Sequence, residues 1–426
     1  MNYHVSHPSK KLAGSILLTA SKSESNRALI IQALCAEKFE IENLAAAQDT
    51  VKLQEILSAA SKQNISTTHD VGPAGTAMRF LTAYFSTQPG THILTGSDRM
   101  KKRPIGILVN ALRELGAQIE YLEEEGFPPL KITGTQLKGG EVEMDGSVSS
   151  QFISALLMIA PELQNGLVIK FKGDVISRPY INMTFKMMEE FRVYGQWQTN
   201  SISVSRQAYH KKSEADYKYK VEADWSSASY WYAMVALCED ADMIIKGLKH
   251  PSLHGDAIIA DVFTFFGVKT EYISDGVRIT KNRVKDEHFG FDFSDCPDIA
   301  QTAAVVVSAM GIPALFNGLQ TLRIKETDRI EALKRELKKI GTDVKVLDDS
   351  CIQINPAATF NQQSVSISTY DDHRMAMAFA ALALKMDSVI IENAEVVKKS
   401  YPGFWEDLKS MGFAVKEVPN STHPNL

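Results

Sequence analysis

Short apolar segments rich in alanine recur along the chain, and a small polar residue precedes each of them. Residues 152–160 are a clear example, because they are apolar on every side of a helix and therefore predict a helix that is buried all round. Six such segments follow one another at intervals of about 70–80 residues, apart from a first interval of about 50. Their expected starts are Ser25, Thr76, Ser150, Ser227, Asp298 and Asp372.

A second pattern has the same spacing and consists of an amphipathic helix, a stop residue and a short strand. Residues 111–115 before Gly116 and residues 404–411 before Gly412 show it, and glycine is the usual residue at a left-handed helix end. Two patterns with one spacing predict six copies of a mixed α/β unit. The other expected stops are Asn64, Gly195, Gly267 and Gly341.

The first copy is shorter than the others by about twenty residues, which are missing between Ala45 and Val71. Part of its sheet is therefore expected to be absent. Six copies divide naturally into two domains of three, each with a bundle of buried helices inside and sheet outside. If the two bundles face one another, the helix starts converge on one cleft.

The composition fits a globular protein and argues against several classes of function. The chain has 426 residues, enough for two or three domains, with 44% hydrophobic and 23% charged residues. A net charge of −5 without a basic block argues against nucleic acid as a partner. No apolar run reaches the roughly 20 residues of a membrane span. Four scattered cysteines without a CxxC pair predict a cytoplasmic protein with neither a zinc site nor disulfides.

The densest group of charges, five in seven residues, precedes the fifth of the amphipathic helices. Thr327 or Asp328 is expected to cap this helix, which places Lys325, Glu326 and Arg329 at its positive end. Cations beside an acid at a helix N-terminus can hold an anion and also move a proton. The alternative is a solvated first turn with charge pairs and no function.

The starts of the buried helices are also rich in side chains that bind anions. Arginine offers permanent, bidentate contacts to phosphate and carboxylate, and serine adds neutral donors. Taken singly, Ser150 has a structural explanation as a helix cap, and Arg79 as the partner of an acid. Their recurrence at equivalent points of six copies favours substrates with several anionic groups, bound between two domains. The residues are Lys22, Ser23, Arg27, Gly75, Thr76, Arg79, Arg99, Arg103, Ser149, Ser150, Gln151, Ser177, Arg178, Tyr180, Asp298, His373 and Arg374.

Seven short strings at these positions resemble the EPSP synthase (3-phosphoshikimate 1-carboxyvinyltransferase) family of enolpyruvyl transferases. They occur in the order typical of that family and extend over nearly the whole chain. Two of them, Lys-Glu-Thr-Asp-Arg and Asp-His-Arg-Met-Ala-Met, are highly specific. The strings lie in residues 21–29, 74–79, 99–106, 149–152, 224–230, 323–329 and 370–377.

The resemblance implies an enzyme that transfers the enolpyruvyl group of phosphoenolpyruvate to the 5-hydroxyl of shikimate 3-phosphate and releases phosphate. This reaction belongs to the shikimate pathway of aromatic amino-acid biosynthesis. The resemblance also implies a two-domain, inside-out α/β barrel with an active site in the interdomain cleft. Residues 1–18 with 223–426 would form one domain and residues 19–222 the other. A monomer without metal or cofactor is expected, and glyphosate is a candidate inhibitor.

The family pattern further implies roles for individual residues. Asp298 would be the base that accepts the proton of the attacking hydroxyl. Glu326 would donate a proton to C3, for which its own pKa must be raised. Lys22 would take part in the proton transfer as well, and how the transfer is divided among these three residues stays open. The implied shikimate 3-phosphate ligands are Ser23, Arg27, Ser149, Ser150, Gln151, Ser177, Tyr180, Asp298 and Lys325. The implied phosphoenolpyruvate ligands are Lys22, Gly75, Arg103, Gln151, Arg329, His373, Arg374 and Lys399.

The chain departs from the family pattern at Pro73, Phe80 and Thr321, where the family commonly has Asn, Pro and Asn. These changes bear on affinity and inhibitor response, because the charged residues are intact. One alternative is the sister enzyme that uses UDP-N-acetylglucosamine, but its usual reactive cysteine is missing from residues 95–103. The other is an inactive binding homologue, although decay would strike Lys22 as readily as the positions that do differ.

Overall fold

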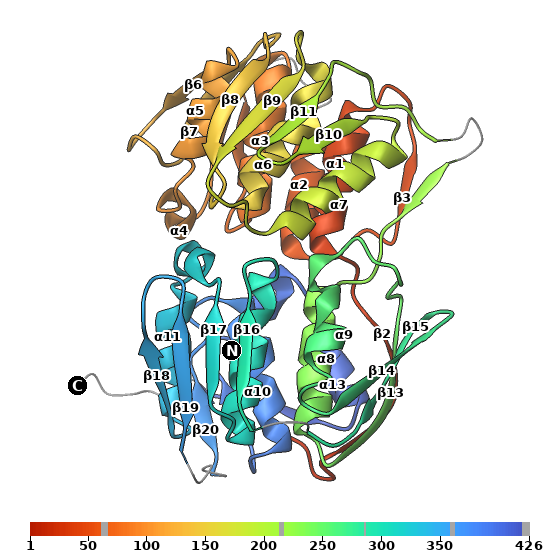
Figure 1. Ribbon diagram of the computed structural model, residues 1–426, viewed down its shortest axis with the longest axis vertical. Coiled ribbons are helices and arrows are strands. Elements are labelled where there is room, and N and C mark those ends of the chain that lie inside the picture. Colours follow the sequence, from red (N-terminus) through yellow and green to blue (C-terminus); the bar gives the residue numbers. More distant parts are fainter. Residues whose placement is uncertain (61–66, 213–216, 285–286, 358–362, 420–426) are drawn as a thin grey trace. The chain divides into compact units, whose positions relative to one another are not determined.

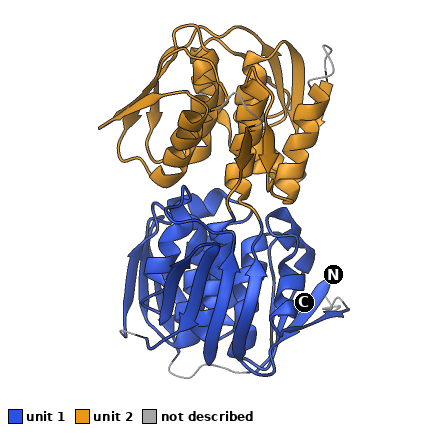
Figure 2. Cartoon of the chain, turned by 90° about the vertical axis from the view of Figure 1, so that its right-hand side faces the viewer, with its two compact units in different colours: residues 1–19, 223–426 blue, residues 20–222 orange. Residues whose placement is uncertain are grey.

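The computed structural model describes residues 1–60, 67–212, 217–284, 287–357 and 363–419 (Figure 1). The chain divides into two compact units: unit 1 is residues 1–19 with 223–426, and unit 2 is residues 20–222 (Figure 2). Helices and strands alternate in both units, so the predicted α/β class is confirmed. The expected stop Asn64 lies outside the described residues.

Unit 1 is built from sheets and helices that alternate along the chain. Its strands are β1 Asn2–Ser6, β2 Lys11–Leu17, β13 Asp240–Lys246, β14 Val268–Ile273, β15 Gly276–Lys281, β16 Phe289–Asp292, β17 Ala314–Asn317, β18 Thr342–Val346, β19 Ile352–Pro356, β20 Val365–Ile367, β21 Val389–Ile391 and β22 Ala414–Val418. Its α-helices are α8 Trp225–Leu237, α9 Ile259–Val262, α10 Ala300–Met310, α11 Arg329–Lys338, α12 His373–Ala380 and α13 Phe404–Ser410. Its 3₁₀ turns are η2 Gly255–Ile258, η3 Pro297–Ile299, η4 Gln320–Ile324, η5 Ala381–Leu384 and η6 Ala394–Lys399.

Unit 2 has the same kinds of element. Its α-helices are α1 Lys22–Leu34, α2 Gln48–Ala60, α3 Gly75–Thr87, α4 Asp98–Lys101, α5 Gly106–Glu114, α6 Ser150–Ile159 and α7 Arg178–Glu190, with the 3₁₀ turn η1 Ala160–Glu162. Its strands are β3 Glu40–Glu42, β4 Thr67–Asp70, β5 Gly90–Thr95, β6 Gln118–Tyr121, β7 Leu130–Gly134, β8 Gly140–Asp145, β9 Leu167–Lys172, β10 Gly195–Gln198, β11 Ser201–Val204 and β12 Lys218–Lys220.

One strand order recurs in all the four-stranded sheets of the described chain. Two parallel strands lie side by side, and two antiparallel strands complete the sheet next to the second of them. β2 pairs with β13 from Lys11↔Asp240 to Leu17↔Lys246, although all of unit 2 lies between these strands in the sequence. β1 completes the sheet of the last strands of the chain. The orders are β4-β5-β7-β6, β8-β9-β11-β10, β2-β13-β15-β14, β16-β17-β19-β18 and β20-β21-β1-β22.

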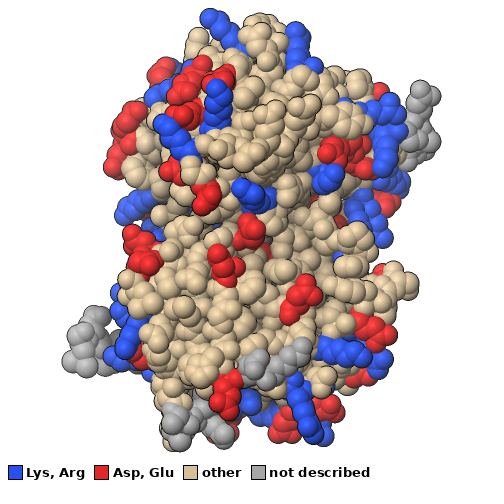
Figure 3. Space-filling view, viewed as in Figure 1, with Lys and Arg blue, Asp and Glu red and all other residues tan. Residues whose placement is uncertain are grey.

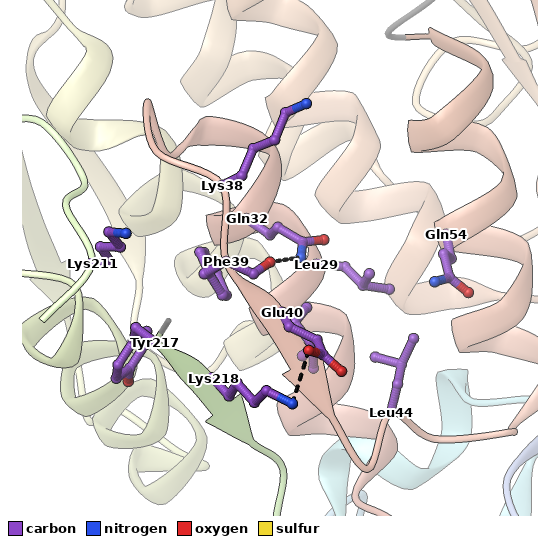
Figure 4. Close-up of a pocket in the computed structure, with 11 residues that line it drawn as sticks. Leu29, Gln32, Lys38, Phe39, Glu40, Leu44, Gln54, Lys211, Tyr217 and Lys218 are labelled. Atoms are coloured by element: carbon purple, nitrogen blue, oxygen red, sulfur yellow. Dashed lines mark hydrogen bonds and ion pairs between the residues drawn. The ribbon is translucent and has the colours of Figure 1, made fainter. Parts of the chain in front are cut away.

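The sheet of the first copy is smaller. β3 pairs in parallel with β12, and within the described residues no further strand joins them. A cavity of about 660 Å³ lies beside β3, and its lining includes the apolar side chains of Leu29, Phe39 and Leu44 as well as Lys38 and Lys211 (Figure 4). The small sheet agrees with the expectation that part of the first copy is absent.

The helices that are apolar on every side lie inside each unit. Every residue of α8 and of α12 is buried. In unit 1, α8, α10 and α12 contact one another, and in unit 2, α1, α3 and α6 do so. The sheets turn one face to the core and the other outward, as the alternating burial along β8 illustrates. Each unit therefore has its own hydrophobic core, with helices inside and sheet outside (Figure 1).

Of the predicted helix starts, only Asp372 caps its helix with its own side chain. Thr76 lies inside α3, Ser149 rather than Ser150 caps α6, and Asp298 lies in η3 before α10.

The hydroxyl of Ser21 caps α1, so Ser25 lies inside the helix. The carboxylate of Asp224 caps α8, and Ser227 lies inside it. Asp372 caps α12, as its position in the pattern predicts. Ser21, Asp224 and Asp372 each have extended backbone, and the side-chain oxygen of each accepts a hydrogen bond from a backbone N–H in the first turn of the helix. This backbone geometry determines which of several neighbouring polar residues becomes the cap.

The expected stops are mostly glycines in the left-handed region, which a residue with a Cβ adopts only at a cost. Gly195 is an exception, because it lies in β10, while Arg192 takes up the positive φ of 61° after α7. A Cβ on Gly195 would meet the ring of Phe185, so this glycine serves close packing instead. The confirmed stops are Gly116, Gly267, Gly341 and Gly412, with φ of 104°, 75°, 85° and 92°.

On the face drawn in Figure 3, Lys and Arg side chains are interspersed with Asp and Glu over each unit. Many charged side chains of the described residues form exposed pairs, such as Lys170 with Glu141 between β9 and β8. Exposed pairs of this kind contribute little to stability or binding. Cations placed to bind a small anion are found instead among the buried residues. None of the described helices is long and apolar enough to cross a membrane.

Candidate active site

A group of charged side chains in unit 1 forms what we call the unit 1 cluster. Its members come from η3, from the turn before α11, from the start of α12 and from η6. Asp328 caps α11, as the sequence allowed, and Asp372 caps α12, and these caps fix the charged residues next to them. The cluster consists of Asp298, Lys325, Glu326, Arg329, Asp372, Arg374 and Lys399.

Arg329 lies at the centre of this cluster, and its side chain is only 2% exposed. Its Nε donates to Oδ2 of Asp372 at 2.7 Å. Its Nη1 donates to Oδ1 of Asp298 at 2.9 Å, and its Nη2 to Oε2 of Glu326 at 3.0 Å. Burial lowers the pKa of Arg329, but the three carboxylates together raise it above its usual value. The guanidinium is therefore a permanent cation that joins three acids.

Asp298 is bound by three cations. Arg374 donates from Nη2 to Oδ2 at 2.7 Å, while Oδ1 faces Arg329 at 2.9 Å and Lys325 at 3.5 Å. Burial alone would raise the pKa of Asp298, yet these three cations hold it well below its usual range. Burial in turn lowers the pKa of Lys325. Asp298 is therefore ionised at neutral pH, as a general base must be.

Glu326 accepts hydrogen bonds on both carboxylate oxygens. Lys399 donates to Oε1 at 2.8 Å, and Arg329 donates to Oε2 at 3.0 Å. Two cations favour the ionised form, whereas the role implied by the resemblance is that of a proton donor. Glu326 fits that role only once an anionic ligand has drawn the cations away from it, so the donor role stays a prediction.

In unit 2, Arg27 is fully buried and is held by neutral acceptors. Its Nε donates to the hydroxyl of Thr184 at 2.7 Å, and its Nη2 to the hydroxyl of Ser154 at 2.9 Å. The backbone carbonyl of Ser23 accepts from Nη1 at 2.9 Å, and that of Tyr180 accepts from Nη2 at 3.2 Å. Burial lowers the pKa of Arg27 to about 10, which leaves it charged at neutral pH.

Lys22 lies at the first position of α1 and pairs with an acid that the sequence patterns did not identify. Its Nζ lies 3.3 Å from Oδ2 of Asp49 in α2. The Asp49 side chain is only 3% exposed, and its other oxygen, Oδ1, has no hydrogen-bond partner within the described residues. The pair directs the ammonium of Lys22 and leaves it partly exposed.

The start of α3 places two arginines around Gly75. A Cβ at this position would lie 2.5 Å from Nη1 of both Arg79 and Arg103. Arg79 also donates to the carbonyl of Gly75 at 2.8 Å and lies over the ring of Phe152. Arg103 is buried, and its Nε has no hydrogen-bond partner within the described chain. The absence of a side chain at Gly75 is therefore what lets two guanidinium groups approach the helix start.

The other expected ligands of unit 2 lie at the starts of α6 and α7. Ser149 caps α6 by accepting from the N–H of Gln151 at 3.4 Å, and Ser150 is the first buried residue of the helix. Ser177 precedes α7 with a φ of 53° and is buried, as is Tyr180 in the first turn. The unusual φ of Ser177 is the kind of backbone strain that occurs at ligand sites.

The residues that depart from the family pattern are also placed by the structure. Pro73 is exposed in the turn before α3, and Phe80 is buried in that helix with Arg27 over its ring, 5.4 Å from the centroid. Thr321 is buried in η4 of unit 1. His373 is buried beside Asp372, with Nδ1 3.7 Å from Oδ1. None of these positions changes the charged contacts described above.

Two functional contacts went unrecognised in the sequence. Asp49 follows no motif, and its distance of 27 residues from Lys22 gives no signal of a contact. Tyr230 was noted only as part of a string, yet Nη1 of Arg374 donates to its hydroxyl at 3.3 Å. Among the described residues, no group of three or more His, Cys, Asp or Glu side chains could hold a metal ion.

The fold and these sites define a class: α/β proteins that bind anionic small molecules through buried cations gathered at helix starts. A sequence model of the EPSP synthase (3-phosphoshikimate 1-carboxyvinyltransferase) family matches residues 6–66 and 58–408. The chain belongs to this family.

Relatives at high coverage agree with this membership. A 3-phosphoshikimate 1-carboxyvinyltransferase from Bacteroides fragilis (strain YCH46) is 48% identical over 417 residues, which is 98% of this chain and 99% of that protein. The protein of the same name from Sulfurovum sp. (strain NBC37-1) is 38% identical, with 96% and 99% covered.

Two solved structures share the fold. An EPSP synthase from Acinetobacter baumannii superposes with a TM-score of 0.77 at 22% identity, with 98% of this chain and 100% of that chain covered. The enolpyruvyl transferase NikO from Streptomyces tendae superposes with a TM-score of 0.74 at 13% identity, with 98% and 99% covered. At these identities the likeness concerns the fold alone.

Proposed function

We propose that this chain transfers the enolpyruvyl group of phosphoenolpyruvate to the 5-hydroxyl of shikimate 3-phosphate, which gives 5-enolpyruvylshikimate 3-phosphate and phosphate. The observation that carries this is the unit 1 cluster, in which Asp298 and Glu326 share the buried cation Arg329. It combines what the reaction needs: fixed positive charge for an anionic substrate, and two carboxyl groups in different surroundings for proton transfer. Family membership supplies the substrate pair.

The chemistry assigns each carboxyl group one step. Asp298, held ionised by its cations, accepts the proton of the 5-hydroxyl as that oxygen forms a bond to C2 of phosphoenolpyruvate. Glu326 gives a proton to C3, which turns the methylene into a methyl group. In the second step the carboxylate of Glu326 takes one C3 proton back as the bond between C2 and the phosphate oxygen breaks, which restores the double bond. The proton held by Asp298 leaves with the phosphate, so both carboxyl groups return to their starting states. Lys22 shares the proton transfer.

The cations bind the two anionic substrates. In unit 1, Arg329, Arg374 and Lys399 bind phosphoenolpyruvate beside His373, and Lys325 holds shikimate hydroxyls together with Asp298. In unit 2, the ligands of phosphoenolpyruvate are Lys22, Gly75, Arg103 and Gln151, and those of shikimate 3-phosphate are Ser23, Arg27, Ser149, Ser150, Gln151, Ser177 and Tyr180. Both sets must act on one pair of substrates. The support for this is burial with defined hydrogen bonds, which fixes most of these side chains in advance.

Three further points belong to this proposal. Each unit is a half of an inside-out α/β barrel with three copies of the repeated unit, which the recurring strand order supports. The enzyme works as a cytoplasmic monomer. The positive charge comes from lysine and arginine, so the reaction runs without metal or cofactor.

The test is the release of phosphate when the purified chain is mixed with both substrates in the presence of a chelator. Release that requires both shikimate 3-phosphate and phosphoenolpyruvate is the expected result. Glu326→Gln should abolish turnover but leave the binding of shikimate 3-phosphate nearly unchanged, while Glu331→Gln, a change in the first turn of the following helix α11, should retain activity. Release with UDP-N-acetylglucosamine in place of shikimate 3-phosphate, or binding without any release, would overturn the proposal.

A further inference from the structure

Glu336 is a buried acid of unit 1 that the mechanism above does not use. It lies on α11 and is only 1% exposed. Its Oε1 accepts from the hydroxyl of Tyr370 at 2.7 Å, and its Oε2 accepts from the backbone N–H of Ser368 at 3.0 Å. Lys339 also donates to Oε2, at 2.6 Å, and supplies the cation that a buried carboxylate needs. Glu336 thus binds the segment between β20 and α12 at two points.

That segment, which we call the 368–371 turn, has an unusual backbone. Tyr370 and Asp371 follow one another with φ of 53° and 56°, in the left-handed region that residues with a side chain seldom adopt. Such a conformation persists only where the surrounding contacts fix it, and it occurs often at ligand sites. The hydrogen bonds from the turn to Glu336 are contacts of this kind.

The residues that follow β21 hold the same turn. Glu392 accepts from the hydroxyl of Ser368 at 2.6 Å, and Asn393 donates from Nδ2 to Oδ1 of Asp371 at 2.7 Å. Asn393 is itself left-handed, with a φ of 48°, and directly precedes η6, which ends at Lys399. The 368–371 turn is therefore bonded both to α11 and to the segment that leads to Lys399.

The three segments joined in this way each carry a cation of the unit 1 cluster. Arg329 begins α11, about two turns before Glu336, and Lys399 ends η6. Asp372 and Arg374 come directly after the turn, and Asp372 accepts from Nε of Arg329 at 2.7 Å. A displacement of the turn would therefore move both Asp372 and Arg374 relative to Arg329.

We propose that Glu336 is a positioning residue, which holds the left-handed 368–371 turn so that the start of α12, with Arg374, is in place before an anionic substrate binds. The proposal deepens the function above and rests on it, because the anion is phosphoenolpyruvate. The hydroxyl of Tyr370 keeps its proton for this contact: burial, together with Glu336, raises its pKa to about 12, and Arg335 opposes the rise. Glu336 acts on the substrate only through Arg374.

The first test measures hydrogen exchange in the intact protein and does not depend on turnover. Glu336→Gln replaces one acceptor oxygen by an NH₂ group, which then faces a donor, so exchange over residues 366–374 should be about tenfold faster or more. If Glu336→Gln does not fold, Tyr370→Phe serves instead, because it removes only the hydroxyl that Glu336 accepts. The matched control is Tyr232→Phe, which removes a hydroxyl hydrogen-bonded to Thr270 elsewhere in unit 1. Equal exchange over residues 366–374 in variant and control would overturn the proposal.

The second test uses the two KM values to separate positioning from a purely structural role. With Arg374 displaced, Glu336→Gln should raise the KM for phosphoenolpyruvate about tenfold or more and leave the KM for shikimate 3-phosphate within about twofold. Tyr232→Phe should change neither value. Faster exchange with an equal rise in both KM values, or with a rise in neither, would refute the positioning role. If the original protein released no phosphate, the proposed function would fail, and the exchange result would still decide whether Glu336 holds the turn.

Discussion

Asp372→Asn tests whether the central arginine depends on its buried carboxylates. Asp372 is completely buried, and its two oxygens have different partners. Oδ2 accepts from Nε of Arg329 at 2.7 Å, and Oδ1 accepts from the backbone N–H of Arg374 at 2.9 Å, which caps α12. An asparagine carbonyl can keep the cap, but its NH₂ group then faces the N–H of Arg329, so two donors meet.

The size of the effect follows from these contacts. Removal of one partner of a buried ion pair typically costs about 3–5 kcal/mol, because the other charge is left without compensation. Here Arg329 keeps Asp298 and Glu326, and the cap survives. We therefore expect a loss near the lower end of that range, about 3 kcal/mol in the free energy of unfolding.

Tryptophan fluorescence during urea unfolding is a suitable assay, because most of the signal comes from unit 1. The chain has four tryptophans. Trp225, Trp231 and Trp405 lie in unit 1, and Trp197 lies in unit 2. The midpoint of the fluorescence transition should fall clearly in Asp372→Asn, while its slope, which reports the surface exposed on unfolding, should stay the same.

The control is Asp242→Asn, which breaks an exposed pair of similar geometry. Arg278 donates to both oxygens of Asp242, at 2.8 and 2.6 Å, but both side chains are about half exposed. This variant should unfold with nearly the original midpoint, because solvent screens the exposed charges. Equal midpoints for Asp372→Asn and Asp242→Asn would refute the reasoning that burial makes the Arg329 network important.

Three further outcomes follow from unit 2. His69 and His92 lie against each other at 3.3 Å and stack on one phenylalanine, and burial lowers the pKa of His69 from 6.5 to about 4. The unfolded chain therefore takes up a proton that the folded chain does not, so up to roughly 3 kcal/mol of stability is lost as the pH falls from 6.5 to 4. Urea titrations should show a smaller loss in His69→Leu than in the original protein, with some loss remaining because burial also lowers the pKa of His92; equal losses in the two proteins would contradict this. Gly75→Ala should push the guanidinium of Arg103 away and raise the KM for phosphoenolpyruvate about tenfold or more. Circular dichroism should show that the fold is intact, and an unchanged KM would contradict the prediction. Asp49→Asn should lower kcat by about tenfold or more, because Lys22 loses the carboxylate that orients its ammonium group. An unchanged kcat would show that the Lys22–Asp49 pair has no role in catalysis.

Glycines in the sequence predicted the ends of helices better than polar residues predicted their beginnings. Gly116 and Gly341 mark true helix ends, because a positive φ is a property of the single residue that adopts it. The start of α1 offers several polar candidates within a few residues, and only the folded backbone selects Ser21 over Ser25. Likewise, Arg192 takes a left-handed conformation that nothing in its own side chain predicts.

The charged residues of the site could be predicted from their strings, but most of their partners could not. Lys325, Glu326 and Arg329 are neighbours in the sequence, so their cluster is a local property. Asp49 reaches Lys22 only through tertiary packing, on an amphipathic helix that carries no motif. The ionisation states of the buried acids are the least predictable from the sequence, because they depend on which acid each cation binds in the folded chain.

The two sets of cations differ in a way that bears on how anions bind. Arg27 in unit 2 is held by hydroxyls and carbonyls, which orient it without neutralising it. Arg329 in unit 1 is held by three carboxylates, so an incoming anion there has to compete with acids that are already bound. Those acids keep four mutually repelling cations together when no substrate is present. In the proposed mechanism two of these acids, Asp298 and Glu326, are also the groups that move protons once an anion takes over their cations. By this mechanism, binding of an anion in unit 1 would change the surroundings of Asp298 and Glu326, so that proton transfer by these acids would depend on the presence of the substrate.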